Sequence, residues 1–117
     1  MKLSPSDLDK CFQLFEEEGY FILPQFFERT DIVGLQERID QIMLGTADVD
    51  YDQIWMQLDT DSGKYEDLSW GGNGFQKATL DYRKIQGLEA DQRFLEFITS
   101  PFFVQLCERV YGPNLPI

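Results

Sequence analysis

Histidine is absent from this chain of 117 residues. Histidine is the usual general base at neutral pH and a common metal ligand, so its absence excludes a Ser-His-Asp triad and any His-containing metal site. Cysteine is scarce as well: Cys11 and Cys107 both lie in apolar helical patterns, and the sequence has no CxxC pair. Two cysteines are too few for a Cys-rich zinc site. We expect two buried free thiols in a reducing cytoplasm, and a disulfide between them is the open alternative.

Basic residues and long apolar runs are also few. Acidic side chains outnumber basic ones by 21 to 10, which gives a formal net charge of -11. Such a balance disfavours phosphate backbones and anionic membranes, so we expect neither nucleic acid nor a membrane surface as a partner. No apolar run approaches the roughly 20 residues that span a bilayer, and the N-terminal residues lack the apolar core of a signal peptide. The sequence therefore predicts a cytoplasmic protein.

Apolar and aromatic residues are plentiful, and they indicate a folded chain. Hydrophobic residues make up 43% of the sequence and ten of them are Phe. A chain of this length forms one domain or less. The patterns below predict an α+β fold that is mostly helical, with residues 1–117 in a single domain.

The first helix has clear start and stop signals. Ser4 suits the N-cap, Pro5 suits the first helical position, and Gly19 suits the C-terminal stop. Apolar residues between them recur at i, i+3, i+4 and i+7, which is one face of an amphipathic helix: Leu8, Cys11, Phe12 and Phe15.

A strand and a second helix are expected next. Tyr20–Leu23 is aromatic and β-branched between Gly19 and Pro24, which predicts a short buried strand. A helix then begins at Thr30 and is closed by Gly45. Its apolar face consists of Ile32, Val33, Leu35, Ile39, Ile42 and Met43.

The helical pattern breaks in an acidic segment, residues 46–74, which ends in the sequence WGGNG. We interpret it as a long loop, either a lid or a mobile segment. Four of its acidic residues fall at positions 1, 3, 5 and 12 of the 12-residue calcium-binding loop of an EF-hand: Asp48, Asp50, Asp52 and Asp59. Gln53 stands where that loop requires Gly, and Asp59 is shorter than the usual bidentate Glu. Weak calcium binding is therefore one alternative function.

The sequence DYRKIQ, residues 81–86, predicts a short polar strand. Side chains alternate along a strand, so we expect Tyr82, Lys84 and Gln86 on one side. Arg83 and Ile85 are expected on the other. Two adjacent cations in an acidic chain suit an anionic small molecule such as a dicarboxylate. Alternatively, they are solvated charges that protect an edge strand from aggregation, and spacing alone leaves both interpretations open.

Two further helices follow the polar strand. The first begins at Asp91 and turns Phe94, Leu95 and Ile98 inward. The second begins at Ser100-Pro101 and ends at Gly112. Its expected apolar stripe is Phe103, Leu106, Cys107 and Val110.

Three segments together resemble the phytanoyl-CoA dioxygenase family of Fe(II)/2-oxoglutarate oxygenases. They are FEEEGYFILPQFF at residues 15–27 with the helix after it, YRKIQ at residues 82–86, and DQRFLEFITSPFFVQLCERVYGPN at residues 91–114. The resemblance implies the N-terminal helices and edge strands of a double-stranded β-helix, or jelly-roll, domain. It also implies that Lys84 contacts 2-oxoglutarate, with Tyr82 and Gln86 as further residues that could line the pocket.

The resemblance covers only the N-terminal portion of such an enzyme. In the family, iron is held by two His and one carboxylate, downstream of the G-P-N turn, and this sequence has no His. We therefore predict an N-terminal fragment of a hydroxylase of a small organic substrate. Neither iron nor 2-oxoglutarate is expected to bind this chain alone, and no catalytic or metal-binding residue is assigned to it.

A different class of function is open beside the oxygenase. The chain would then be a small helical protein-interaction module without catalytic activity. If a barrel is missing, apolar helix faces are left exposed and drive association. We expect the isolated chain to self-associate.

Overall fold

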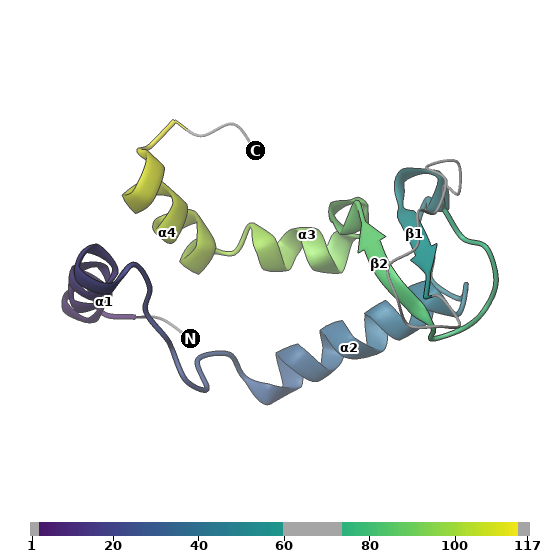
Figure 1. Ribbon diagram of the computed structural model, residues 1–117, viewed down its shortest axis with the longest axis horizontal. Helices are drawn as coiled ribbons and strands as arrows, with labels where there is room; N and C mark the ends of the chain where they lie inside the picture. Colours follow the sequence, from purple (N-terminus) through teal and green to yellow (C-terminus); the bar gives the residue numbers. More distant parts are fainter. Residues whose placement is uncertain (1–2, 60–73, 115–117) are drawn as a thin grey trace. The chain divides into compact units, whose positions relative to one another are not determined.

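The computed structural model describes residues 3–59 and 74–114, which fall into two compact units. The first unit consists of Met1–Ile32 and Pro101–Ile117, and the second of Val33–Ser100. Among the described residues, no helix is both long and apolar enough to cross a membrane. The α-helices and strands, labelled in Figure 1, are α1 (Pro5–Glu18), α2 (Arg29–Met43), β1 (Trp55–Leu58), β2 (Tyr82–Gln86), α3 (Gln92–Ile98) and α4 (Pro101–Tyr111). Two short 3-10 helices, η1 (Tyr51–Gln53) and η2 (Leu88–Ala90), precede β1 and α3.

Helix α1 begins and ends where the sequence predicts. The Ser4 hydroxyl accepts a hydrogen bond from the backbone N–H of Asp7 at 3.2 Å, and Pro5 is the first helical residue. At the other end, Gly19 adopts a φ of 83° and its N–H donates to the Phe15 carbonyl at 2.8 Å. A left-handed residue at this place satisfies the carbonyls of the last turn, and glycine reaches that conformation without steric cost.

Aromatic contacts hold the first unit together. Phe26 is buried, and its ring lies 4.3 Å from the ring of Phe102 on α4. Arg109 of α4 pairs with Asp9 of α1 at 2.7 Å, and its guanidinium lies over the Phe12 ring at 4.9 Å from the centroid. Contact between two aromatic rings and a cation above an aromatic face are both attractive. Helices α1 and α4 are thereby joined by both apolar and charged groups.

The strand predicted at Tyr20–Leu23 does not form. Tyr20 is 62% exposed and Ile22 is 74% exposed, and the segment leads into a turn at Pro24 and Gln25. Aromatic and β-branched residues favour strands because they pack on a pleated surface with neighbouring strands. Among the described residues, the only strand pairing is between β1 and β2, and residues 20–23 take no part in it.

The second unit has its core where α2 meets the sheet. Ile42 of α2, Ile54, Met56 of β1 and Tyr82 of β2 form one buried cluster. The prediction of a long loop at residues 46–74 was therefore partly wrong, because η1 and β1 lie within these residues. Residues 60–73 of that loop lie outside the described residues. Because acidic residues surround β1, the sequence did not indicate a strand there, although a buried side chain of β1, Met56, contributes to the core.

Strands β1 and β2 are antiparallel, and their register shifts between Gln57 and Leu58. The Cα partners are Trp55 with Gln86, Met56 with Ile85, Gln57 with Lys84, and Leu58 with Tyr82. The shift makes Arg83 the extra residue of a bulge. Tyr82 therefore faces the core, as Ile85 does, while Lys84 and Gln86 are exposed. The prediction that Tyr82 shares a side with Lys84 was wrong, because a bulge interrupts the alternation.

The apolar stripe of α4 is only partly covered. Phe103 stacks on Phe27, with ring centroids 5.8 Å apart, whereas Cys107 and Val110 are exposed. Cys11 is half-buried, and both thiols are free. The expectation of two buried thiols was therefore wrong, since Cys11 is only half-buried and Cys107 is exposed. Ile98 of α3, expected to face inward, is exposed as well, because amphipathic periodicity identifies an apolar face and does not supply what covers it.

Candidate functional site

Lys84 lies on the side of the β1–β2 sheet that faces away from the core. Its Cα partner is Gln57, and Trp55 and Gln86 form the next pair on the same side. Met56 and Ile85, between these pairs, turn to the core instead. We call Trp55, Gln57, Lys84 and Gln86 the polar sheet face. It places the ammonium group of Lys84 at an exposed position, where an anion can reach it.

The bulge brings Arg83 close to this face. Its Nε donates a hydrogen bond to the side-chain oxygen of Gln57 at 3.3 Å. Alternation along the strand predicted that Arg83 and Lys84 point to opposite sides. Instead, Arg83 bonds the side chain that stands directly opposite Lys84. Sequence reasoning missed both this contact and Gln57, because neither follows from the spacing of residues in one strand.

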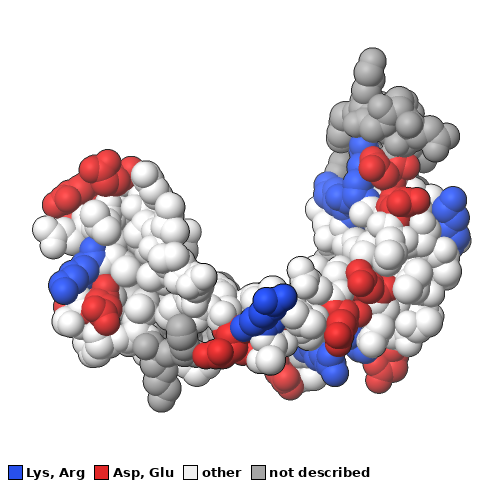
Figure 2. Space-filling model, turned by 90° about the horizontal axis from the view of Figure 1, so that it is seen from below, with Lys and Arg blue, Asp and Glu red and all other residues white. Residues whose placement is uncertain are grey.

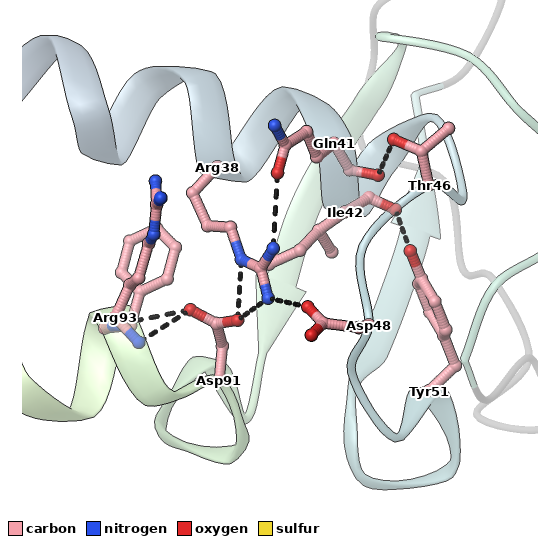
Figure 3. A network of polar contacts seen from close by, with 9 residues as sticks. Arg38, Gln41, Ile42, Thr46, Asp48, Tyr51, Asp91 and Arg93 are labelled. Atoms are coloured by element: carbon pink, nitrogen blue, oxygen red, sulfur yellow. Dashed lines mark hydrogen bonds and ion pairs between the residues drawn. The ribbon is translucent and has the colours of Figure 1, made fainter.

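A second polar cluster, shown in Figure 3, joins α2 to the start of α3. Arg38 of α2 donates from Nε to the Asp91 carboxylate at 2.8 Å, and its Nη2 lies 2.6 Å from the same oxygen. Its Nη2 also reaches Asp48 at 2.8 Å, and Nη1 reaches Gln41 at 3.2 Å. The other Asp91 oxygen accepts the backbone N–H groups of Arg93 at 3.1 Å and Phe94 at 3.3 Å. Both oxygens of the Asp91 carboxylate thus accept hydrogen bonds that stabilise the fold.

Arg38 changes the protonation equilibrium of its exposed partner. Its hydrogen bond, followed by a backbone hydrogen bond, holds the pKa of Asp48 below its ordinary value. The pKa of Arg38 is raised, chiefly by its hydrogen bonds to Asp91 and Asp48. Both groups therefore stay charged throughout the physiological pH range. This cluster is therefore suited to structural support, because its charged groups are joined by direct hydrogen bonds.

The sequence held a signal for this cluster. Arg38 lies one helical turn from Leu35 and Ile42, so the expected apolar face of α2 includes a cation beside it. A half-buried Arg requires a carboxylate partner. Asp91, which is buried and begins α3 as predicted, is that partner.

Two of the four acidic residues proposed for calcium binding, Asp48 and Asp50, have side-chain contacts with other groups. Asp48 pairs with Arg38, and Asp50 accepts from the Asp52 N–H and the Gln53 side chain, both at 3.1 Å. Asp50 thereby caps η1. Across residues 3–59 and 74–114, no three Cys, Asp or Glu side chains are grouped to hold a metal ion. The remaining acids of the segment 46–74, which are not part of the calcium count, lie outside the described residues: Asp61, Glu66 and Asp67.

This chain lacks the ligands of an oxygenase iron centre. The required pair of His ligands has no counterpart in a sequence without His. A 2-oxoglutarate carboxylate, by contrast, fits the exposed ammonium of Lys84 by charge. The face seen in Figure 2 carries basic side chains interspersed with acidic ones.

Comparison with known proteins identifies no relative: no family model, no curated protein and no solved structure matches the chain. The resemblance described from the sequence therefore rests on its three segments alone.

Proposed function

We propose that this chain forms the N-terminal part of an Fe(II)/2-oxoglutarate-dependent hydroxylase resembling the phytanoyl-CoA dioxygenase family, with Lys84 as a contact of the 2-oxoglutarate. The observation that carries the proposal is the position of Lys84. It lies on the strand YRKIQ, exposed, on the sheet side opposite the core. An ammonium group there can form a charge-assisted hydrogen bond with a carboxylate, which is stronger than a neutral one.

The order of elements supports the proposal. Helices α1 and α2, strand β2, and the pair α3 and α4 follow one another in the order of the resembling segments. One departure is the segment 20–23, which is not a strand. Iron in such an enzyme activates O2 for hydroxylation of a C–H bond in a small organic substrate. Its ligands must come from outside these 117 residues, so this chain alone is not expected to catalyse turnover.

The first test is the nucleotide sequence beyond the codon for Ile117. We expect an open frame that continues into an H-x-D motif and a later His. A stop codon directly after Ile117 in the expressed gene would remove the oxygenase proposal for this chain.

The second test is Lys84→Ala in the complete enzyme. Loss of a hydrogen bond to a charged group costs about 1.5–3 kcal/mol, so we expect KM for 2-oxoglutarate to rise roughly 10- to 150-fold. Succinate formation at varied 2-oxoglutarate measures it. Lys77→Ala is the matched control, because Lys77 is also exposed and its removal changes the net charge equally. Equal KM values for wild type and Lys84→Ala would contradict the role of Lys84.

A protein-interaction module is the second candidate, and exposed apolar residues are consistent with it. Ile22 is 74% exposed and Tyr111 is 73% exposed in the first unit, and Leu80 is 55% exposed in the second. Exposed apolar surface of this kind binds either a partner or the rest of a larger domain.

Self-association separates these two candidates. We expect the isolated chain to sediment as oligomers and to bind the dye ANS, because an incomplete domain exposes surface meant to be covered. Ile22→Ser combined with Tyr111→Ser should reduce both signals, and Glu17→Ser serves as the control on exposed polar surface of α1. A chain that is monomeric, unfolds cooperatively and does not bind ANS would favour the protein-interaction module.

A further inference from the structure

The bulge in β2 gathers two cationic residues and an amide at one place on the sheet. Gln57 is the Cα partner of Lys84, and it also accepts a hydrogen bond from Arg83 at 3.3 Å. In a bulge, two consecutive residues of one strand stand opposite a single residue of the other. Arg83 and Lys84 are therefore both neighbours of Gln57. Without the register shift, they would point to opposite sides of the sheet.

The contact with Arg83 fixes which end of the Gln57 amide is available. A guanidinium group only donates hydrogen bonds, so its partner must be the amide oxygen of Gln57. The amide nitrogen then points away from Arg83 with its two N–H donors. Gln57 is half-buried, and a side chain tied to the neighbouring strand loses little further freedom when it binds a ligand.

We propose that Gln57 donates a second hydrogen bond to the carboxylate that Lys84 binds, and that Arg83 is the positioning residue for Gln57. This inference rests on the proposed function, since it concerns the same 2-oxoglutarate group. A carboxylate has two oxygens that accept hydrogen bonds in its plane. Lys84 engages one as a point charge, while the amide of Gln57 engages the other and selects a planar carboxylate over a spherical anion.

The bulge is the feature that turns a charged edge strand into a site. Solvated charges that prevent aggregation need no ordered partner on the neighbouring strand. Here the side chain opposite Lys84 is oriented by the residue next to Lys84. Bulges occur beside active sites because they redirect a side chain, and this one places Arg83 where it orients a hydrogen-bond donor.

Isothermal titration of 2-oxoglutarate into the complete, metal-free protein tests the assignment independently of turnover. We expect Gln57→Leu to weaken binding roughly 10- to 150-fold, the equivalent of one hydrogen bond to a charged group of about 1.5–3 kcal/mol. Gln57→Glu should weaken it further, because it replaces the donors by a negative charge. Arg83→Met should weaken binding in the wild-type background and have no further effect in the Gln57→Leu background. Arg83→Lys, which retains a donor, should restore part of the loss.

The outcomes separate this inference from the proposed function. If Lys84→Ala weakens binding while Gln57→Leu and Arg83→Met bind as wild type does, the proposed function stands and the role of Gln57 is overturned. If Arg83→Met still weakens binding in the Gln57→Leu background, Arg83 acts otherwise than through Gln57. If Lys84→Ala binds normally, or the wild type does not bind 2-oxoglutarate, the proposed function itself fails. Thermal melts of each variant check that the sheet remains folded.

Discussion

Asp91→Ala is expected to lower the free energy of unfolding of the second unit by about 3–5 kcal/mol, the usual cost of breaking a buried ion pair. Asp91 is 1% exposed and receives Arg38 at 2.8 Å together with the first backbone N–H groups of α3. Its removal deprives a half-buried guanidinium of its buried partner and removes the N-cap of α3. A loss of this size is comparable to the whole stability of a small domain.

Urea unfolding followed by tryptophan fluorescence measures this loss, since Trp55 lies on β1 of the same unit. Asp48→Ala is the matched control. It removes the other carboxylate of the same Arg38, but Asp48 is 94% exposed, and solvent-exposed pairs contribute little. We expect its unfolding curve to lie close to that of wild type. Equal effects of the two substitutions would show that burial of the Asp91 pair does not determine its strength.

Helix ends were the part of the fold that the sequence predicted well. Ser4, Gly19, Gly45 and Asp91 occupy or adjoin helix ends as expected. Capping depends on one or two neighbouring residues, so it can be identified from local sequence. Strand β2 was also predicted, from its polar alternating sequence.

Features that depend on distant residues were not predicted. Trp55–Leu58 became strand β1 because β2 pairs with it, although the surrounding acids suggested a loop. Tyr20–Leu23 has a better strand composition and stays outside any sheet. Strand formation depends on the availability of a partner edge more than on composition, and a single sequence does not reveal where that edge lies.

The candidate site shows the same division. Lys84 was predicted from the resemblance of the segment YRKIQ to the oxygenase family, because its position on a polar strand alone left a solvated edge charge as the alternative. Gln57 and Arg83 were missed because their contact depends on the register between two strands 24 or more residues apart and on a one-residue bulge. A one-residue change in register moves side chains from one face to the other, so no rule of alternation within β2 could place Arg83.

Glycine substitutions in the second unit give the last prediction, because Gly87 holds the end of β2 against the segment before β1. Gly87 has a φ of 82°, and a Cβ atom there would collide with the carbonyl oxygen of Gln53. A left-handed conformation costs a residue with a side chain about 1–2 kcal/mol, and the collision with backbone adds to that. We expect Gly87→Ala to lower the free energy of unfolding by at least about 2 kcal/mol.

Two glycines of the same unit separate these causes. Gly45 has a φ of 75°, but its Cβ would meet only the Phe75 ring, whose side chain is exposed and can turn away; Gly45→Ala should therefore cost about 1–2 kcal/mol for the backbone alone. Gly34 lies in α2 with nothing within 4 Å, so Gly34→Ala should stabilise the protein by about 0.5–1 kcal/mol. Urea unfolding of the three variants tests this order. If Gly87→Ala costs no more than Gly45→Ala, the Gln53 carbonyl yields easily, and the position of β2 beside β1 is set by the core rather than by Gly87.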